Sequence, residues 1–246
     1  MKATKINLLD FKSAPMRTFH ITWITFFICF YGWFGIAPLM PVVREELGLT
    51  KSQIGNIIIA SVAITVFARL FFGWLCDRIG PRLSYTILLL IGSLPVTFIG
   101  VSDSYETFLL FRLAIGVIGA SFVITQYHTS VMFAPNVVGT ANATVAGWGN
   151  MGGGVTLMFM PFVFASLVGM GYLNGAAWRY SMVLPGIALF IMGLVYYFFT
   201  QDTAEGDFKQ TRGNKSEYKK SNSGGNFLSA CRDYRVWVLF LAYGAW

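Results

Sequence analysis

Long runs of apolar residues, separated by short polar stretches, repeat along the 246-residue chain. A helix needs about 20 consecutive apolar residues to cross the hydrocarbon core of a bilayer. Six runs have about this length, at 19–39, 54–75, 83–100, 108–133, 139–168 and 180–199, and a seventh opens near Val236. The pattern predicts an all-α membrane protein, with six transmembrane helices over residues 19–200 and a chain truncated within a seventh transmembrane helix.

Basic residues lie on one set of the loops between these runs. They cluster before the first run, between the second and third, and between the sixth and seventh, whereas the opposite loops hold only Arg44, Lys51 and Arg179. Cytoplasmic loops carry such an excess of Lys and Arg. We therefore expect a cytoplasmic N-terminus (1–18), a basic cytoplasmic linker (201–232) and the start of a seventh helix (233–246).

The composition places the chain in a lipid bilayer, since 55% of its residues are hydrophobic and 12% are charged, against about 25% charged in soluble domains. We expect a multi-pass protein of the cell membrane, inner or plasma. Topology explains the net charge of +7, so no nucleic-acid partner is expected. The three cysteines have no metal-ligand spacing, and His20 and His128 have no acidic or cysteine neighbour, so both are interpreted as boundary residues. We expect no metal, no cofactor and no enzyme activity.

Arg69 is the charged residue that the pattern places deepest in the membrane. It precedes Asp77 by eight residues, which is about 12 Å of helix at 1.5 Å per residue. The hydrocarbon core is about 30 Å thick, so Arg69 is expected near the midplane. No Asp or Glu lies in any run. A buried cation of this kind favours an anion-binding site; a structural arginine that extends toward the surface is the alternative.

The stretch AGWGNMGGGV, residues 146–155, carries five glycines within a predicted membrane helix. Each glycine costs about 1 kcal/mol against alanine in a helix interior. Asn150 lies about 15 Å above the cytoplasmic end of its helix. Small residues allow close helix packing, and the stretch supplies a GxxxG pair, Gly149 and Gly153, extended by Gly147, Gly152 and Gly154. We expect one face to pack tightly on a neighbour while Asn150 offers its amide to the site; packing alone is the alternative.

The segment GWLCDRIGPR lies between the second and third runs, and it resembles the loop signature of the major facilitators through Gly73, Asp77, Arg78, Gly80 and Arg82. A solvated turn would be the simpler interpretation. The resemblance implies the six-helix N-terminal bundle of a transporter built from two such bundles, with substrate at their interface. Arg112, in FRLAIGVIG, resembles the family's fourth-helix pattern, and we expect it to bond backbone carbonyls, with a substrate role as the alternative.

GWGNMGGG resembles the nitrate signature of the nitrate/nitrite porter family, a branch of the major facilitators. The similarity runs from about Phe19 to the end of the chain and includes WFGIAPLMPVVREELGLT. It implies that Arg69 grips a planar anion, with Asn150 and Gly147 from the signature beside it. It also implies two aromatic walls and a seventh-helix tyrosine, which match Phe27, Phe122 and Tyr243, with Phe26 and Phe30 as close alternatives to Phe27.

The resemblance implies a nitrate/nitrite transporter that works by alternating access. A planar guanidinium with forked donors suits a planar oxyanion. The family's second arginine comes from an eighth helix that this chain lacks, so we expect a missing C-terminal half to be required for activity. A major facilitator for another small anion and a non-transporting truncated fragment remain alternatives. The spans lack Asp and Glu, which favours nitrate–nitrite exchange over proton symport without deciding between antiporter and symporter.

Overall fold

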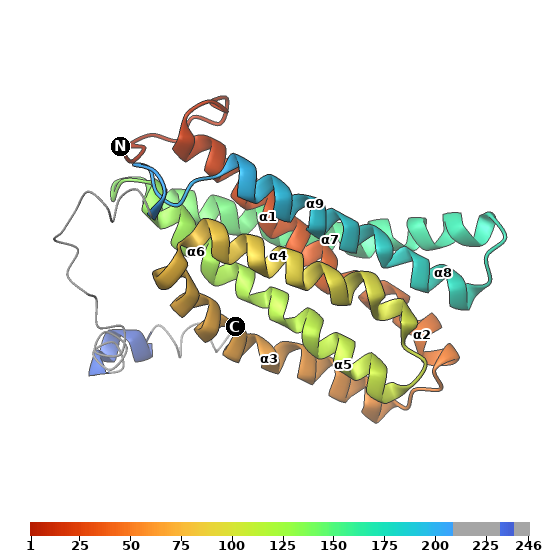
Figure 1. The fold of residues 1–246 in the computed structure, drawn as a ribbon. Coiled ribbons are helices and arrows are strands. Elements are labelled where there is room, and N and C mark those ends of the chain that lie inside the picture. Colours follow the sequence, from red (N-terminus) through yellow and green to blue (C-terminus); the bar gives the residue numbers. More distant parts are fainter. Residues whose placement is uncertain (209–231, 239–246) are drawn as a thin grey trace. The chain divides into compact units, whose positions relative to one another are not determined.

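The computed structural model describes residues 1–208 and 232–238, and Tyr243 lies outside them. Residues 1–208 form one compact unit, and residues 209–246 belong to a second. The first unit is built of helices between Ala14 and Phe199, joined by short connections (Figure 1). Its α-helices are α1 Ala14–Phe34, α2 Met40–Glu46, α3 Lys51–Ile79, α4 Pro81–Phe98, α5 Tyr105–Gly116, α6 Ser121–Met132, α7 Val138–Gly169, α8 Asn174–Ser181 and α9 Val183–Phe199, with 3₁₀ turns η1 Ala37–Leu39, η2 Ile99–Val101 and η3 Val117–Ala120.

These elements join into six continuous segments that are long and apolar enough to cross a membrane: Ala14–Glu46, Lys51–Ile79, Pro81–Val101, Tyr105–Met132, Val138–Gly169 and Asn174–Phe199. The six predicted spans are therefore confirmed, although the first helix starts earlier than residue 19. Pro15 lies in its first turn, where proline's fixed φ favours helix initiation. Met16 is also buried, so this turn already belongs to the packed structure.

Local sequence sets several of the helix ends. Thr50 and Gln53 form a capping box that starts α3, and Ser104 forms another with Thr107 at the start of α5. Such boxes satisfy backbone donors that have no partner within the helix. Between α3 and α4 the chain turns at Gly80, whose φ of 92° suits glycine and strains other residues.

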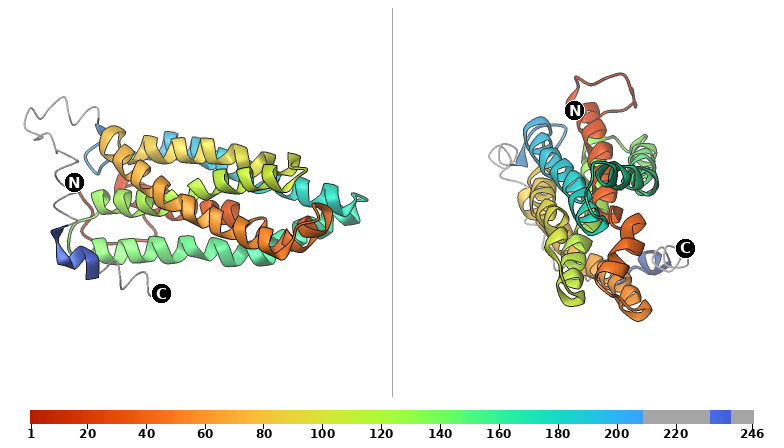
Figure 2. Two further views of the ribbon diagram at one scale, coloured as in Figure 1. Left: turned by 90° about the horizontal axis from the view of Figure 1, so that it is seen from below. Right: turned by 90° about the vertical axis from the view of Figure 1, so that its right-hand side faces the viewer.

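Glycines allow the helices of this unit to approach one another closely. A Cβ at Gly116 of α5 would lie 2.3 Å from the backbone oxygen of Ser61 on α3, and one at Gly186 of α9 would meet Thr97 of α4. The views in Figure 2 show α1 in the interior, between α9 and α7. Without a hydrophobic force between helices in lipid, such close backbone packing is a main source of association.

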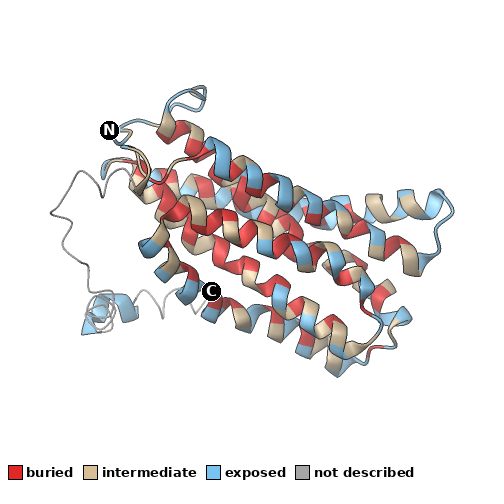
Figure 3. Ribbon diagram, in the orientation of Figure 1, coloured by how far each residue is buried: buried red, intermediate tan, exposed pale blue. Residues whose placement is uncertain are grey.

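Burial is uneven among the six spans. In α3 the most apolar stretch is 28% buried and in α7 it is 17% buried, against 50% in the first, third and fourth spans. Figure 3 shows the buried surfaces facing the interior of the bundle and exposed surfaces along α3. The helices that carry Arg69 and Asn150 are therefore the two with the most open surface.

Candidate anion-binding site

Arg69 lies on α3, with its guanidinium over an aromatic ring. The Cζ atom is 5.7 Å from the ring centroid of Phe122 on α6, a cation–π geometry. Its Nε–H donates to the carbonyl oxygen of Gly119 at 3.4 Å. Arg69 is exposed. The predicted pair of Arg69 and Phe122 is thus brought together, and one edge of the guanidinium is held by backbone.

Aromatic rings continue from Phe122 toward α1. The centroid of Phe122 lies 5.9 Å from that of Phe26, which is fully buried, and Phe26 is 4.9 Å from Phe30 in an edge-on arrangement. The ring that contacts Phe122 is therefore Phe26, one of the two alternatives weighed from the sequence. Phe27, the residue selected there, presents its backbone to α7 near Gly152. A difference of one residue turns a helical side chain by about 100°.

The glycine cluster packs α7 directly on α1. A Cβ at Gly152 would lie 2.2 Å from the backbone oxygen of Phe27, and one at Gly149 would lie 2.2 Å from the ring of Phe26. Gly153 makes only ordinary contacts, with Phe30 at 3.5 Å. The tight pair is thus Gly149 and Gly152, not the expected Gly149 and Gly153. Gly152 and Gly153 lie on opposite sides of Gly149 around the helix, by about 60° and about 40°, and α1 packs on the side that carries Gly152.

The remaining signature residues lie on the other side of α7. Asn150 and Gly147 are exposed, and so is Gly154. A Cβ at Gly147 or Gly154 would meet nothing within 4 Å. Asn150 follows Gly149 in the chain, so it lies at the level of Phe26, on the open face of its helix. Contacts thus connect Arg69, Phe122 and Phe26, and Asn150 and Gly147 are exposed on α7.

Arg112 is buried between α1 and α3. It donates to the carbonyl oxygen of Trp33 at 3.1 Å and to the hydroxyl of Ser61 at 3.3 Å. The expected bonding to backbone carbonyl is confirmed. The Arg112 side chain on α5 therefore links α5 to α1 and α3, next to the close approach of Gly116 to α3.

The residues of the loop signature occupy the end of the bundle at which the chain enters α1. Gly73 lies 3.7 Å from Val123 at its ideal Cβ position, so α3 approaches α6 there. Asp77 and Arg78 are exposed in the last turns of α3, and Arg78 lies over the ring of Trp74 at 4.9 Å. These two charges are placed at the water-facing end of the helix.

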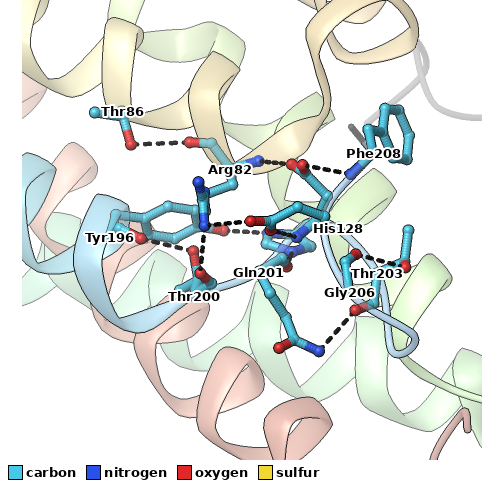
Figure 4. A network of polar contacts seen from close by, with 11 residues as sticks. Arg82, Thr86, His128, Tyr196, Thr200, Gln201, Thr203, Gly206 and Phe208 are labelled. Carbon is cyan, nitrogen blue, oxygen red and sulfur yellow. Dashed lines mark hydrogen bonds and ion pairs between the residues drawn. The ribbon is translucent and has the colours of Figure 1, made fainter. Parts of the chain in front are cut away.

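The other two signature residues hold the segment that follows α9. Arg82 forms an ion pair with Asp207 at 2.9 Å, and its backbone N–H donates to Asp202 at 3.1 Å. A Cβ on Gly80 would overlap the Asp202 carboxylate. Asp202 is buried, and burial raises the pKa of its carboxyl. Two residues of the signature therefore bind the segment 200–208 of the same chain (Figure 4).

His128 lies at the centre of this end of the bundle and is fully buried. Its Nδ1 lies 2.5 Å from the hydroxyl of Tyr196, and its Nε2 lies 2.8 Å from the carbonyl oxygen of Gln201. The Tyr196 hydroxyl also lies 3.1 Å from Thr22 on α1. His128 lies in the last turn and a half of α6, and its partners come from 68 and 73 residues away along the chain. His20, interpreted like His128 as a boundary residue, is buried and stacks on Phe11.

At the opposite end, an ion pair joins the first and sixth spans. Arg179 donates to Glu46 at 2.8 Å and to the carbonyl oxygen of Ser102 at 2.8 Å. Trp178 donates to the same carboxylate. Within the described residues, no group of three His, Cys, Asp or Glu side chains is placed to hold a metal ion.

Residues 22–246 match the Major Facilitator Superfamily. Over 243 residues the chain is 40% identical to the high affinity nitrate transporter 2.5 of Arabidopsis thaliana, covering 99% of this chain and 48% of the relative. It is 34% identical to the nitrate/nitrite transporter NrtP of Picosynechococcus, covering 83% of this chain and 42% of that protein. The chain thus spans about half the length of the curated relatives it matches.

Solved structures agree on the fold. The crystal structure of a bacterial homologue of the human lysosomal transporter Spinster, inward-facing and unoccupied, has a TM-score of 0.65 at 16% identity, covering 78% of this chain and 44% of that one. The occupied form has a TM-score of 0.66, covering 83% and 48%. The predicted resemblance to nitrate/nitrite porters is confirmed by the relatives named above. The chain, a multi-pass membrane protein, belongs to the Major Facilitator Superfamily.

Proposed function

We propose that this chain contributes the N-terminal half of a nitrate/nitrite transporter that works by alternating access. The observation that carries the proposal is the position of Arg69, whose guanidinium lies over Phe122 in the open face of α3. Relatives at 40% and 34% identity are named as nitrate and nitrate/nitrite transporters. Transport, not enzyme activity, is the function that this family membership supports.

The chemistry of the cluster suits a small planar oxyanion. The guanidinium is planar, permanently charged and offers forked donors to two oxygen atoms. With its Nε–H on the Gly119 carbonyl, the group has a fixed orientation and pays less entropy on binding. Phe122 forms an apolar wall beside it, and the fully buried Phe26 packs against the Phe122 ring. The Phe122 ring would exclude water from one side of the ion and strengthen its attraction to Arg69.

The exposed faces of α3 and α7 support a partner half in the proposed protein. Asn150 and Gly147 lie on this open surface of α7, where they would face either lipid or another six-helix bundle. An amide exposed to hydrocarbon is costly, so a covering bundle is favoured. We propose that this half supplies the second arginine and completes the seventh helix, whose start in this chain carries Tyr243. By the distribution of basic loops, the N-terminus lies in the cytoplasm.

The test is anion uptake into proteoliposomes by this chain and by the same chain extended with a C-terminal six-helix half. Nitrate uptake that nitrite inhibits, in the extended protein alone, is the expected result. Uptake of formate in preference to both ions would favour the other-anion alternative, and no uptake by either protein would leave the chain a non-transporting fragment.

Arg69→Lys, made in the extended protein, tests the site itself. Lysine keeps the charge but loses the planar fork. A charge-assisted hydrogen bond contributes about 1.5–3 kcal/mol, so we expect apparent nitrate affinity to fall by about 10- to 100-fold. Arg44→Lys is the matched control, because Arg44 bonds the carbonyl of Leu49 at the far end of the bundle. Unchanged affinity in Arg69→Lys would remove Arg69 from the site.

A further inference from the structure

The N-terminal loop, residues 7–13, presents large apolar side chains to solvent immediately before the first membrane helix. Leu8 is 44% exposed, Leu9 87% and Phe11 61%. Figures 1 and 2 show the loop projecting sideways from the bundle near the start of α1, across the direction of the helices rather than along it. A sideways projection from the end of a membrane-spanning bundle lies parallel to the bilayer surface.

The backbone of the loop is closed by its own polar groups. The Asp10 carboxylate accepts from the backbone N–H of Lys12 at 2.9 Å and of Ser13 at 3.0 Å, and from the Ser13 hydroxyl. Asp10 donates its backbone N–H to the Asn7 carbonyl, and Leu9 donates to the Asn7 side chain. Because these donors are satisfied internally, the loop can enter a less polar medium without leaving them unpaired.

The loop is also fixed to the bundle, and its flanks are basic. Residue Ala3 pairs with the connection between α6 and α7, through its N–H to Met132 and its carbonyl to Ala134. Lys5 and Lys12 are exposed on either side of the apolar tip. Apolar side chains flanked by lysine are the composition of segments that lie in the headgroup region of anionic membranes.

We propose that the N-terminal loop is an interfacial anchor, which inserts Leu9 and the face of Phe11 that does not stack on His20 among the headgroups of an anionic bilayer, while Lys5 and Lys12 bind their phosphates. The occupant is lipid, because the loop lies at the end of the bundle where the chain enters α1, and residues 1–13, with three lysines against one aspartate, complement anionic headgroups. The proposal concerns a surface apart from the anion site, so it stands whether or not nitrate is the substrate.

The test attaches a nitroxide spin label to Leu9→Cys in the full chain. Cys231 is replaced by serine so that it is not labelled, and Cys29 and Cys76 are retained because they are buried. The label's accessibility to oxygen and to a water-soluble nickel chelate is measured in nanodiscs of phosphatidylcholine with and without phosphatidylglycerol. Glu205→Cys is the control, exposed at the same end of the bundle. We expect the ratio of oxygen to nickel accessibility to be several-fold higher at Leu9 than at Glu205, and to rise with phosphatidylglycerol.

Two results would overturn the anchor, and a third would refute the role of its lysines. Nickel access at Leu9 equal to that at Glu205 would place the loop in water. Protection of Leu9 from both reagents, in nanodiscs and in detergent alike, would show that protein covers it. An oxygen-to-nickel accessibility ratio at Leu9 that is the same with and without phosphatidylglycerol would refute the proposed binding of headgroup phosphates by Lys5 and Lys12. The double variant Lys5→Gln with Lys12→Gln is expected to abolish the dependence on lipid charge.

Discussion

Replacing Gly152 by alanine measures how much the close approach of α7 and α1 contributes to stability. The added Cβ would lie 2.2 Å from the Phe27 carbonyl oxygen, where ordinary contact begins at 3.4 Å. Backbone must therefore move by 3.4 − 2.2 = 1.2 Å, and the carbonyl belongs to a helix that cannot yield alone. Overpacking of this kind costs about 1–3 kcal/mol.

Gly154→Ala is the matched control, because its Cβ would meet nothing within 4 Å. Both variants gain the same helix propensity, about 1 kcal/mol, so this contribution cancels in the comparison. Gly152→Ala should then be less stable than Gly154→Ala by about 1–3 kcal/mol. Reversible unfolding in sodium dodecyl sulfate, followed by tryptophan fluorescence, measures the difference. Equal stability of the two variants would refute the close-packing argument.

A larger side chain extends the same reasoning to function. Gly152→Leu places several more atoms against Phe27, so we expect the chain to insert in the membrane while uptake by the extended protein is lost. Membrane extraction and proteoliposome uptake measure the two properties separately. Normal uptake in Gly152→Leu would show that the distance between α7 and α1 does not matter for transport.

Three further changes test the polar contacts. Tyr196→Phe leaves buried His128 without its hydroxyl partner and should cost about 1–3 kcal/mol in unfolding free energy, whereas Tyr197→Phe, partly exposed, should be near neutral. Arg112→Lys loses the fork that serves two acceptors and should lower the melting temperature. Burial raises the pKa of Asp202 above 3.8, so the native state binds its proton more tightly than the unfolded state. The contribution of this proton to the free energy of unfolding is complete below pH 3.8 and is lost as pH rises through the native pKa of Asp202. Asp202→Asn should therefore reduce the dependence of the unfolding free energy on pH. An Asp202→Asn variant with the same dependence on pH would contradict the raised pKa.

The six spans could be predicted from the sequence because a bilayer imposes a length on any apolar helix. The same physics identified the packing role of Gly149 and the carbonyl contact of Arg112, since small residues and buried donors have few alternatives in lipid. The choice between Phe26 and Phe27 could not be settled in this way. Adjacent positions differ by about 100° around a helix, and a run rich in phenylalanine gives no signal of which ring turns inward.

The sequence pattern did not predict the polar contacts between residues far apart in the chain. His128 and Tyr196 are 68 residues apart, and each lies in an apolar run that looks uniform. Their pairing depends on α6 and α9 both packing against α1 and α4, an arrangement that only the fold supplies. In the same way, Arg82 belongs to a recognisable motif, but its partner Asp207 lies in a stretch that composition alone assigns to a linker. The ion pair between them could therefore not be predicted.

The packing of α1 on α7 has a consequence for biosynthesis. α1 ends at Phe34 and α7 begins at Val138, so roughly 100 residues are translated between them. At about 5–20 residues per second, the ribosome takes about 5–20 s to produce this interval. During that time the Phe26 and Phe27 surface of α1 awaits the glycines that complement it. The first helix must therefore remain in the bilayer, against lipid or the translocation machinery, until its partner is made.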